Sequence, residues 1–142
     1  MADTMKNKEI VRRYRELHNT NRLDQLDQIV NRDLISHNLM PGLPQGLDSG
    51  KKVHQSLIAS FPDNRVITDE LIAEGDYVVE RWTNTGTHTG APFMNAPATS
   101  KKFKVSGVSI YRIANGKIAE HWGEFDSASI LQQLGLMKMP TQ

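Results

Sequence analysis

An α+β fold is predicted by a change in the spacing of apolar residues near residue 64. Before this point apolar residues recur every three to four positions, as in amphipathic helices, and after it they alternate with polar residues, as in β-strands. Each such element has one apolar face to bury, so the helices are expected to cover one face of an antiparallel sheet. The 142 residues fit one domain, spanning residues 1–142.

Three helices are predicted in the first half of the chain. They cover residues 5–19, residues 23–30 and a segment that begins near residue 48 and ends at Phe61, before a proline. Residues 34–40 are too few for a stable helix and lead into a loop rich in proline and glycine.

Four strands and a short last helix are predicted after residue 64. Gly75-Asp76 and Asn115-Gly116 are typical of the tight turns that join the two strands of a hairpin. In chain order, the strands cover residues 65–73, 77–87, 101–113 and 117–125, and the helix covers residues 127–134.

Alternation in the last two strands predicts which side chains face the helices. The residues expected to point inward are Phe103, Val105, Gly107, Ser109 and Tyr111, followed by Ala119, His121, Gly123 and Phe125. Several of these are small, so the inner face should leave room for a small, largely apolar molecule. Glu120 and Trp122 are expected to point outward.

The strand over residues 77–87 leaves its direction open, because either Arg81 or Trp82 is out of place for a monomer. If Arg81 points inward, the outer face carries an apolar patch, and such a patch is typical of a subunit interface. A homodimer, or a larger assembly, is therefore expected through Trp82, Val108, Ile110 and Trp122.

Composition argues against several classes of function. The 17 basic and 16 acidic residues balance without a basic face, so nucleic-acid binding is not expected. No apolar run approaches the ~20 residues of a membrane span, and residues 1–8 lack the apolar core of a signal peptide, so a cytoplasmic protein is expected. There is no cysteine, and the histidines lack the spacing of metal ligands, so no metal is expected.

The order of the elements and several motifs resemble the SnoaL-like polyketide cyclases and ester cyclases. The motifs are the hairpin Tyr111-Arg112-Ile113…Asn115-Gly116-Lys117-Ile118…His121-Trp122, the segment Gly86-Thr87-His88-Thr89-Gly90 and the closing Gln133-Leu134-Gly135. The resemblance covers nearly the whole chain. It implies three N-terminal helices on a strongly curved antiparallel sheet, forming a cone with an internal cavity. Ketosteroid isomerase, limonene epoxide hydrolase and nuclear transport factor 2 share this cone.

The resemblance also implies where the reacting groups of two relatives fall. The acid/base aspartate of the cyclases falls on Gly123, which cannot move a proton, and a neighbouring cyclase histidine falls on Ser109. The oxyanion-hole tyrosine of ketosteroid isomerase matches Tyr14, and its aspartate base falls on Asn38. The chain thus keeps the frame of each site without its carboxylate.

A third comparison concerns limonene epoxide hydrolase, whose arginine matches Arg81 while Thr83 and Gly123 replace its two aspartates. Arg81 could clamp a carboxylate or polarise a carbonyl, with an ordinary surface ion pair as the alternative. Thr83 joins it as a substrate-binding candidate. His88, beside a glycine-rich turn, could contact the ligand or serve the structure.

His121 and His37 are the catalytic candidates, because histidine titrates near neutral pH and can accept or donate a proton. The alternative for each is a structural hydrogen bond. Tyr14 and Ser109 are expected to bind substrate with Arg81, Thr83 and His88. His18 and His54 are expected to be solvated.

Two functions remain open. The first is an enzyme that performs cofactor-free acid/base chemistry, such as cyclisation, isomerisation or dehydration, on a small carbonyl compound or ester. The second is a cone that binds an apolar molecule, or serves oligomerisation, without catalysis. Polar groups expected in the cavity favour the first, and Gly123 favours the second.

Overall fold

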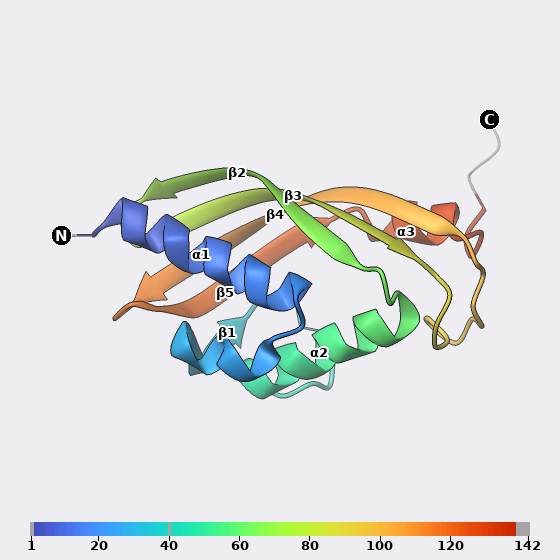
Figure 1. Cartoon of the computed structure of the whole chain (residues 1–142), viewed down its shortest axis with the longest axis horizontal. Helices are drawn as coiled ribbons and strands as arrows, with labels where there is room; N and C mark the ends of the chain where they lie inside the picture. Colours follow the sequence, from blue (N-terminus) through green and yellow to red (C-terminus); the bar gives the residue numbers. More distant parts are fainter. Residues whose placement is uncertain (1, 40, 139–142) are drawn as a thin grey trace.

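The computed structural model describes residues 2–39 and 41–138 and shows a curved sheet with α1 and α2 on its concave side (Figure 1). This arrangement confirms the predicted α+β fold. The elements in chain order are α1 Thr4–Asn19, the 3₁₀ helix η1 Leu23–Gln28, β1 Val30–Ser36, α2 Leu47–Ser60, β2 Arg65–Glu74, β3 Tyr77–Thr87, β4 Lys102–Ala114, β5 Lys117–Phe125 and α3 Ser127–Gln133.

Helix α1 is capped by Asp3, whose carboxylate accepts a hydrogen bond from the backbone amide of Lys6 at 3.1 Å. The helix buries Val11 and Leu17, and Ile10 and Tyr14, which share helical spacing with Leu17, pack beside them. In the part of the chain that the structure describes, no helix has the length and apolar content to cross a bilayer.

The sheet contains one strand more than predicted, in the order β1-β5-β4-β3-β2. Strands β2 to β5 form the predicted antiparallel meander, whereas β1 lies parallel to β5 at the edge. The prediction of a helix over residues 23–30 is therefore wrong at its C-terminal end, because η1 ends at Gln28 and β1 begins at Val30. The hydrogen-bond partner of β1 lies far along the chain, so local periodicity does not reveal the strand.

The β4–β5 hairpin brings the candidate site residues together. Asn115 and Gly116 have φ angles of 51° and 76°, as the predicted tight turn requires. The resulting register places Tyr111 opposite His121 and Ser109 opposite Gly123. These four positions share the face that points toward the helices, which confirms the predicted parity of β4 and β5.

The direction of β3 is now defined, with Trp82 inward and Arg81 outward. Trp82 lies opposite Gly107 and is 8% exposed, so its expected place on the outer face was wrong. A Cβ at Gly107 would lie 2.4 Å from the Trp82 ring. The indole thus fills the volume that glycine leaves, and this close approach explains the inward direction of Trp82.

Two apolar clusters hold the helices on the sheet. The first lies between α1, η1, β1 and the sheet and contains Val11, Leu17, Leu23, Leu26, Ile29, Val30, Leu34, Leu47, Val78, Tyr111, Ile113 and Ile118. The second joins the end of α2 and helix α3 to the sheet and contains Phe61, Trp82, Phe103, Val105, Ile130 and Leu134. Each fully buried aliphatic or aromatic side chain contributes about 1.5–3 kcal/mol. Polar side chains lie on the inner face between them.

Candidate active site

His121 lies on the inner face of β5 with its ring against Tyr111, the two centroids 5.2 Å apart. Among the described residues, none forms a hydrogen bond with the His121 ring. Burial, reinforced by the charge of Arg15, lowers the pKa of His121 to about 4. The imidazole is therefore neutral at pH 7 and has a lone pair that can accept a proton.

The space beside Gly123 is the geometric centre of the site. A Cβ at this glycine would lie 3.5 Å from Nε2 and from Cε1 of His121, and 3.6 Å from Oγ of Ser109. These are ordinary van der Waals distances, so an alanine side chain would fit at this position without displacing a neighbour. The imidazole of His121 and the hydroxyl group of Ser109 therefore converge on Gly123 from two sides.

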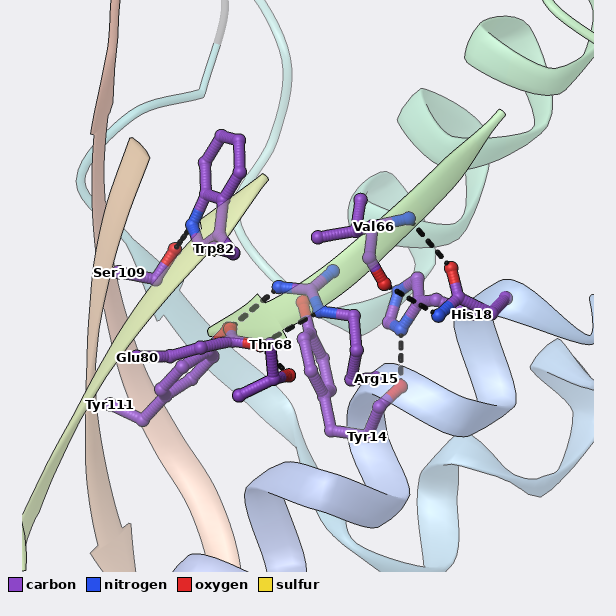
Figure 2. Close-up of polar contacts among 10 residues, drawn as sticks. Tyr14, Arg15, His18, Val66, Thr68, Glu80, Trp82, Ser109 and Tyr111 are labelled. Carbon is purple, nitrogen blue, oxygen red and sulfur yellow. Dashed lines mark hydrogen bonds and ion pairs between the residues drawn. The ribbon is translucent and has the colours of Figure 1, made fainter. Parts of the chain in front are cut away.

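Ser109 is oriented by the indole of Trp82. Nε1 of Trp82 donates a hydrogen bond of 2.9 Å to Oγ of Ser109, and Figure 2 shows this pair side by side. Because Oγ accepts from the indole, its own proton remains available to a third group. We call Trp82, Ser109, His121 and Gly123 the inner-face site.

A buried ion pair lies next to the inner-face site and connects α1 to the sheet. Arg15 donates to both carboxylate oxygens of Glu80, from Nε at 3.0 Å and from Nη2 at 2.7 Å (Figure 2). Tyr111 and Thr68 each donate a further hydrogen bond of 2.7 Å to Glu80. The carboxylate thus accepts four hydrogen bonds while its side chain is fully buried.

Protonation in this network is set by opposing effects. Burial raises the pKa of Glu80, but the hydrogen bond and charge of Arg15 outweigh it, so the pKa lies below its usual value. Burial also raises the pKa of Tyr14 and of Tyr111. At neutral pH the network contains a carboxylate, a guanidinium and two neutral phenols.

Aromatic rings continue from the inner-face site to the helices. The centroids are 5.3 Å apart between Tyr111 and Tyr14, 4.2 Å between Tyr14 and His18, and 4.8 Å between His18 and His54. Nδ1 of His18 donates to the carbonyl of Tyr14 at 2.8 Å, and burial lowers the pKa of His18 to about 3. Burial also lowers the pKa of His54, whose Nε2 is buried, so the expectation that His18 and His54 are solvated was wrong.

Comparisons with known proteins agree with this architecture. The profile of the SnoaL-like polyketide cyclase family matches residues 8–134. The chain belongs to this family. Among curated proteins, nogalonic acid methyl ester cyclase from Streptomyces nogalater is 29% identical over 124 residues, covering 82% of this chain and 88% of the relative.

Two solved structures superpose closely on this one. IdmH from Streptomyces antibioticus, a candidate polyketide cyclase, has a TM-score of 0.80 at 28% identity and covers 91% of this chain and 98% of its own. TsrD from Streptomyces laurentii has a TM-score of 0.86 at 24% identity, with 96% and 100% covered. The second likeness shows the shared fold.

Three of the predicted site residues lie on the outer face, away from the inner-face site of this family member. Arg81 lies beside Glu70, with Nε 3.5 Å from its carboxylate, and Thr83 donates to Asp69 at 2.6 Å. His37 was expected near the cavity, but its Nε2 lies 2.6 Å from Glu120. Because successive residues of a strand face opposite sides, the inward Trp82 forces Arg81 and Thr83 outward.

The remaining predicted residues are buried or half-buried. Tyr14 and Ser109 lie near the inner-face site, as described. His88 is fully buried at the start of the 88–101 loop, where its ring contacts the hydroxyl of Thr99 at 3.2 Å and the carbonyl of Ala91 at 3.1 Å. Both ring nitrogens are thus used within the loop, and the structural interpretation of His88 is the one that this geometry favours.

Sequence reasoning missed Arg15 and Glu80. Glu80 shares the inward parity of Trp82, and Arg15 follows Val11 at i+4 on the buried side of α1, so helical spacing offered one signal. The paired charges are what make both positions tolerable in the interior. Within residues 2–39 and 41–138, no group of three or more histidine, aspartate or glutamate side chains gathers to hold a metal ion.

Proposed function

We propose that this protein is a cofactor-free cyclase that acts by acid/base chemistry on a small hydrophobic carbonyl or ester compound. Its family membership supports cyclisation, as does a relative named for the cyclisation of a methyl ester. The observation that carries the proposal is the convergence of His121 and Ser109 on Gly123 from two sides.

The proposed reaction begins when Nε2 of His121 removes a proton from a carbon next to a carbonyl group. The enolate oxygen accepts a hydrogen bond from the Ser109 hydroxyl, and the carbanion attacks a second carbonyl to form a carbon–carbon bond. The resulting alkoxide takes the proton back from the imidazolium, which restores neutral His121. A preorganised hydroxyl donor at the oxyanion lowers the barrier without reorganisation.

The low pKa of His121, about 4, restricts the substrate. A weak base removes only an acidic proton at a useful rate, because its driving force for proton transfer is small. A carbon between two carbonyl groups, as in a β-keto ester, has such a proton.

Binding without catalysis is the second candidate, and Gly123 is the observation in its favour. No carboxylate stands where the resemblance places the cyclase aspartate, so the site would hold a hydrophobic ligand without turning it over. The two functions differ in a single respect, which is whether His121 moves a proton.

Ring closure of nogalonic acid methyl ester and of a panel of β-keto esters tests the proposal. We expect turnover by the native protein and a loss of at least ~100-fold in His121→Ala, the contribution of a general base. His37→Ala, on the outer face, is expected to keep the rate. Saturable ligand binding without turnover in the native protein would establish the binding function instead.

We further propose that a second copy of this chain covers the outer face of the sheet. Ile72, Val79, Ile110 and Trp122 form a continuous apolar row across four strands, because each lies opposite the next in the register. Ile72 is 56% exposed and Ile110 is 36% exposed. Exposed apolar rows of this kind mark interfaces.

The charges around this row suit a copy of the same chain. Arg81 and Arg112 lie near Glu70 and Glu120, so both signs are present and a two-fold axis can bring opposite charges together. Of the expected patch, Ile110 and Trp122 belong to this row, Val108 is 41% exposed nearby, and only Trp82 points inward; Ile72 and Val79 are additions.

Light scattering at micromolar concentration tests the assembly. The native protein should have at least twice the chain mass of 16.0 kDa, whereas Ile110→Asp should be monomeric and folded. Met94→Asp, which changes a side chain 68% exposed in the 88–101 loop, is the matched control and should not alter the mass. A monomeric native protein would contradict the interface.

A further inference from the structure

A surface groove runs between the second half of α1 and the beginning of β2. It is open to solvent, has a volume of about 300 Å³ and is lined by none of the four residues of the inner-face site. Most of the surface in the groove is apolar, and the charged residues that line it are Arg12, Arg15, Glu16 and Arg65. Asn19 fixes the two walls, since its side chain donates to the Val66 carbonyl at 2.7 Å and accepts from the Val66 amide at 3.0 Å.

One guanidinium nitrogen of Arg15 has no hydrogen-bond partner among the described residues. Nε and Nη2 both bond to Glu80, and Nη2 also donates to Tyr111 at 3.1 Å. Figure 2 shows the third nitrogen, Nη1, pointing away from Glu80 toward Val66, a wall of the groove. The Arg15 side chain is 15% exposed, and Nη1 is not among the buried polar atoms that lack a partner, so it is open to the solvent of the groove.

The rim of the groove adds further positive charge. Arg65 is exposed at the start of β2 and forms no ion pair with any residue that the structure describes. Arg12 pairs with Glu9 on the surface, and the acidic wall residue Glu16 is neutralised by Arg22 at 2.9 Å. The uncompensated charge at the groove is therefore positive.

We propose that this groove binds a small oxyanion, a phosphate or carboxylate group, between Nη1 of Arg15 and the guanidinium of Arg65. Guanidinium groups present planar pairs of N–H donors that match both kinds of anion. A volume of about 300 Å³ leaves room for an organic portion attached to the anion. The site is separate from the inner-face site, so it does not depend on the proposed cyclase activity.

The test measures anion binding by the native protein with NMR, using inorganic phosphate and succinate in parallel titrations. Ionic strength is held constant with chloride, and the backbone amides of Thr20 and Val66 report on the groove. We expect saturable shifts at these amides with one or both anions, and the responding anion identifies the class of ligand.

Two arginine variants of equal charge make the test specific. Arg65→Gln should weaken binding at least fivefold, whereas Arg32→Gln, which removes an exposed arginine from β1, should leave it unchanged. If Arg65→Gln does not fold, Arg12→Gln, a second variant at the rim of the groove, should also weaken anion binding and replaces it in the test. Shifts that never saturate with either anion, or equal weakening by Arg65→Gln and Arg32→Gln, would overturn the proposal.

Discussion

Replacing Glu80 with glutamine should cost a large part of the stability of this domain. The carboxylate accepts four hydrogen bonds, two of them from Arg15, and the side chain has no exposed surface. Glutamine keeps the shape but leaves the buried charge of Arg15 uncompensated. Removing one partner of a buried ion pair costs about 3–5 kcal/mol, a large share of the about 5–15 kcal/mol that stabilises a typical domain.

Urea unfolding of the native protein and of Glu80→Gln measures this difference directly. Glu70→Gln is the matched control, because its carboxylate lies 3.5 Å from Arg81 but is 55% exposed, and exposed pairs contribute at most about 1 kcal/mol. In Glu80→Gln combined with Arg15→Met, part of the loss should return, since the buried charge is gone. A loss below 1 kcal/mol in Glu80→Gln, on the order of the exposed pair, would refute the reasoning.

Two further predictions concern protons and space. His121, with a pKa of about 4 in the folded protein, binds its proton more weakly than in the unfolded chain, so its contribution to stability is complete above pH 6.5 and falls as the pH drops toward 4. At pH 4 the free energy of unfolding should be lower by about 3 kcal/mol than above pH 6.5. In His121→Gln, the free energy of unfolding should depend less steeply on pH. An unchanged slope would show that His121 is not buried in the folded protein. Gly107→Ala should destabilise by about 1–3 kcal/mol because its Cβ would meet Trp82 at 2.4 Å. Gly123→Ala should change stability by less than about 0.5 kcal/mol, because the nearest atom to its added Cβ would be 3.5 Å away. Urea unfolding measures both variants. Equal losses of stability in Gly107→Ala and Gly123→Ala would contradict the difference in packing at the two glycines.

Much of the fold could be predicted because its signals are local. The Asn115-Gly116 turn defines its own hairpin, and alternation from it correctly placed Ser109 and His121 on the inner face and Trp122 on the outer face. Strand β1 was not predicted because its polar residues 31–33 lack a strand pattern, and only the distant β5 provides its hydrogen bonds.

The direction of β3 could not be predicted for a related reason. The long 88–101 loop separates β3 from β4, so no tight turn transmits the register from one strand to the other. The deciding contact, between Trp82 and Gly107, joins residues on two strands and leaves no local trace. Arg15 and Glu80 were missed with it, since each is tolerable in the interior only because the other is there.

Proton removal by His121 is tested most directly by deuterium exchange. In deuterium oxide at neutral pH, the native protein should speed the exchange of the acidic C–H of a β-keto ester beyond the rate in buffer, even if the compound does not cyclise. His121→Ala should lower the catalysed rate by about 10²–10⁴-fold. An equal catalysed rate in His121→Ala would show that another group removes the proton.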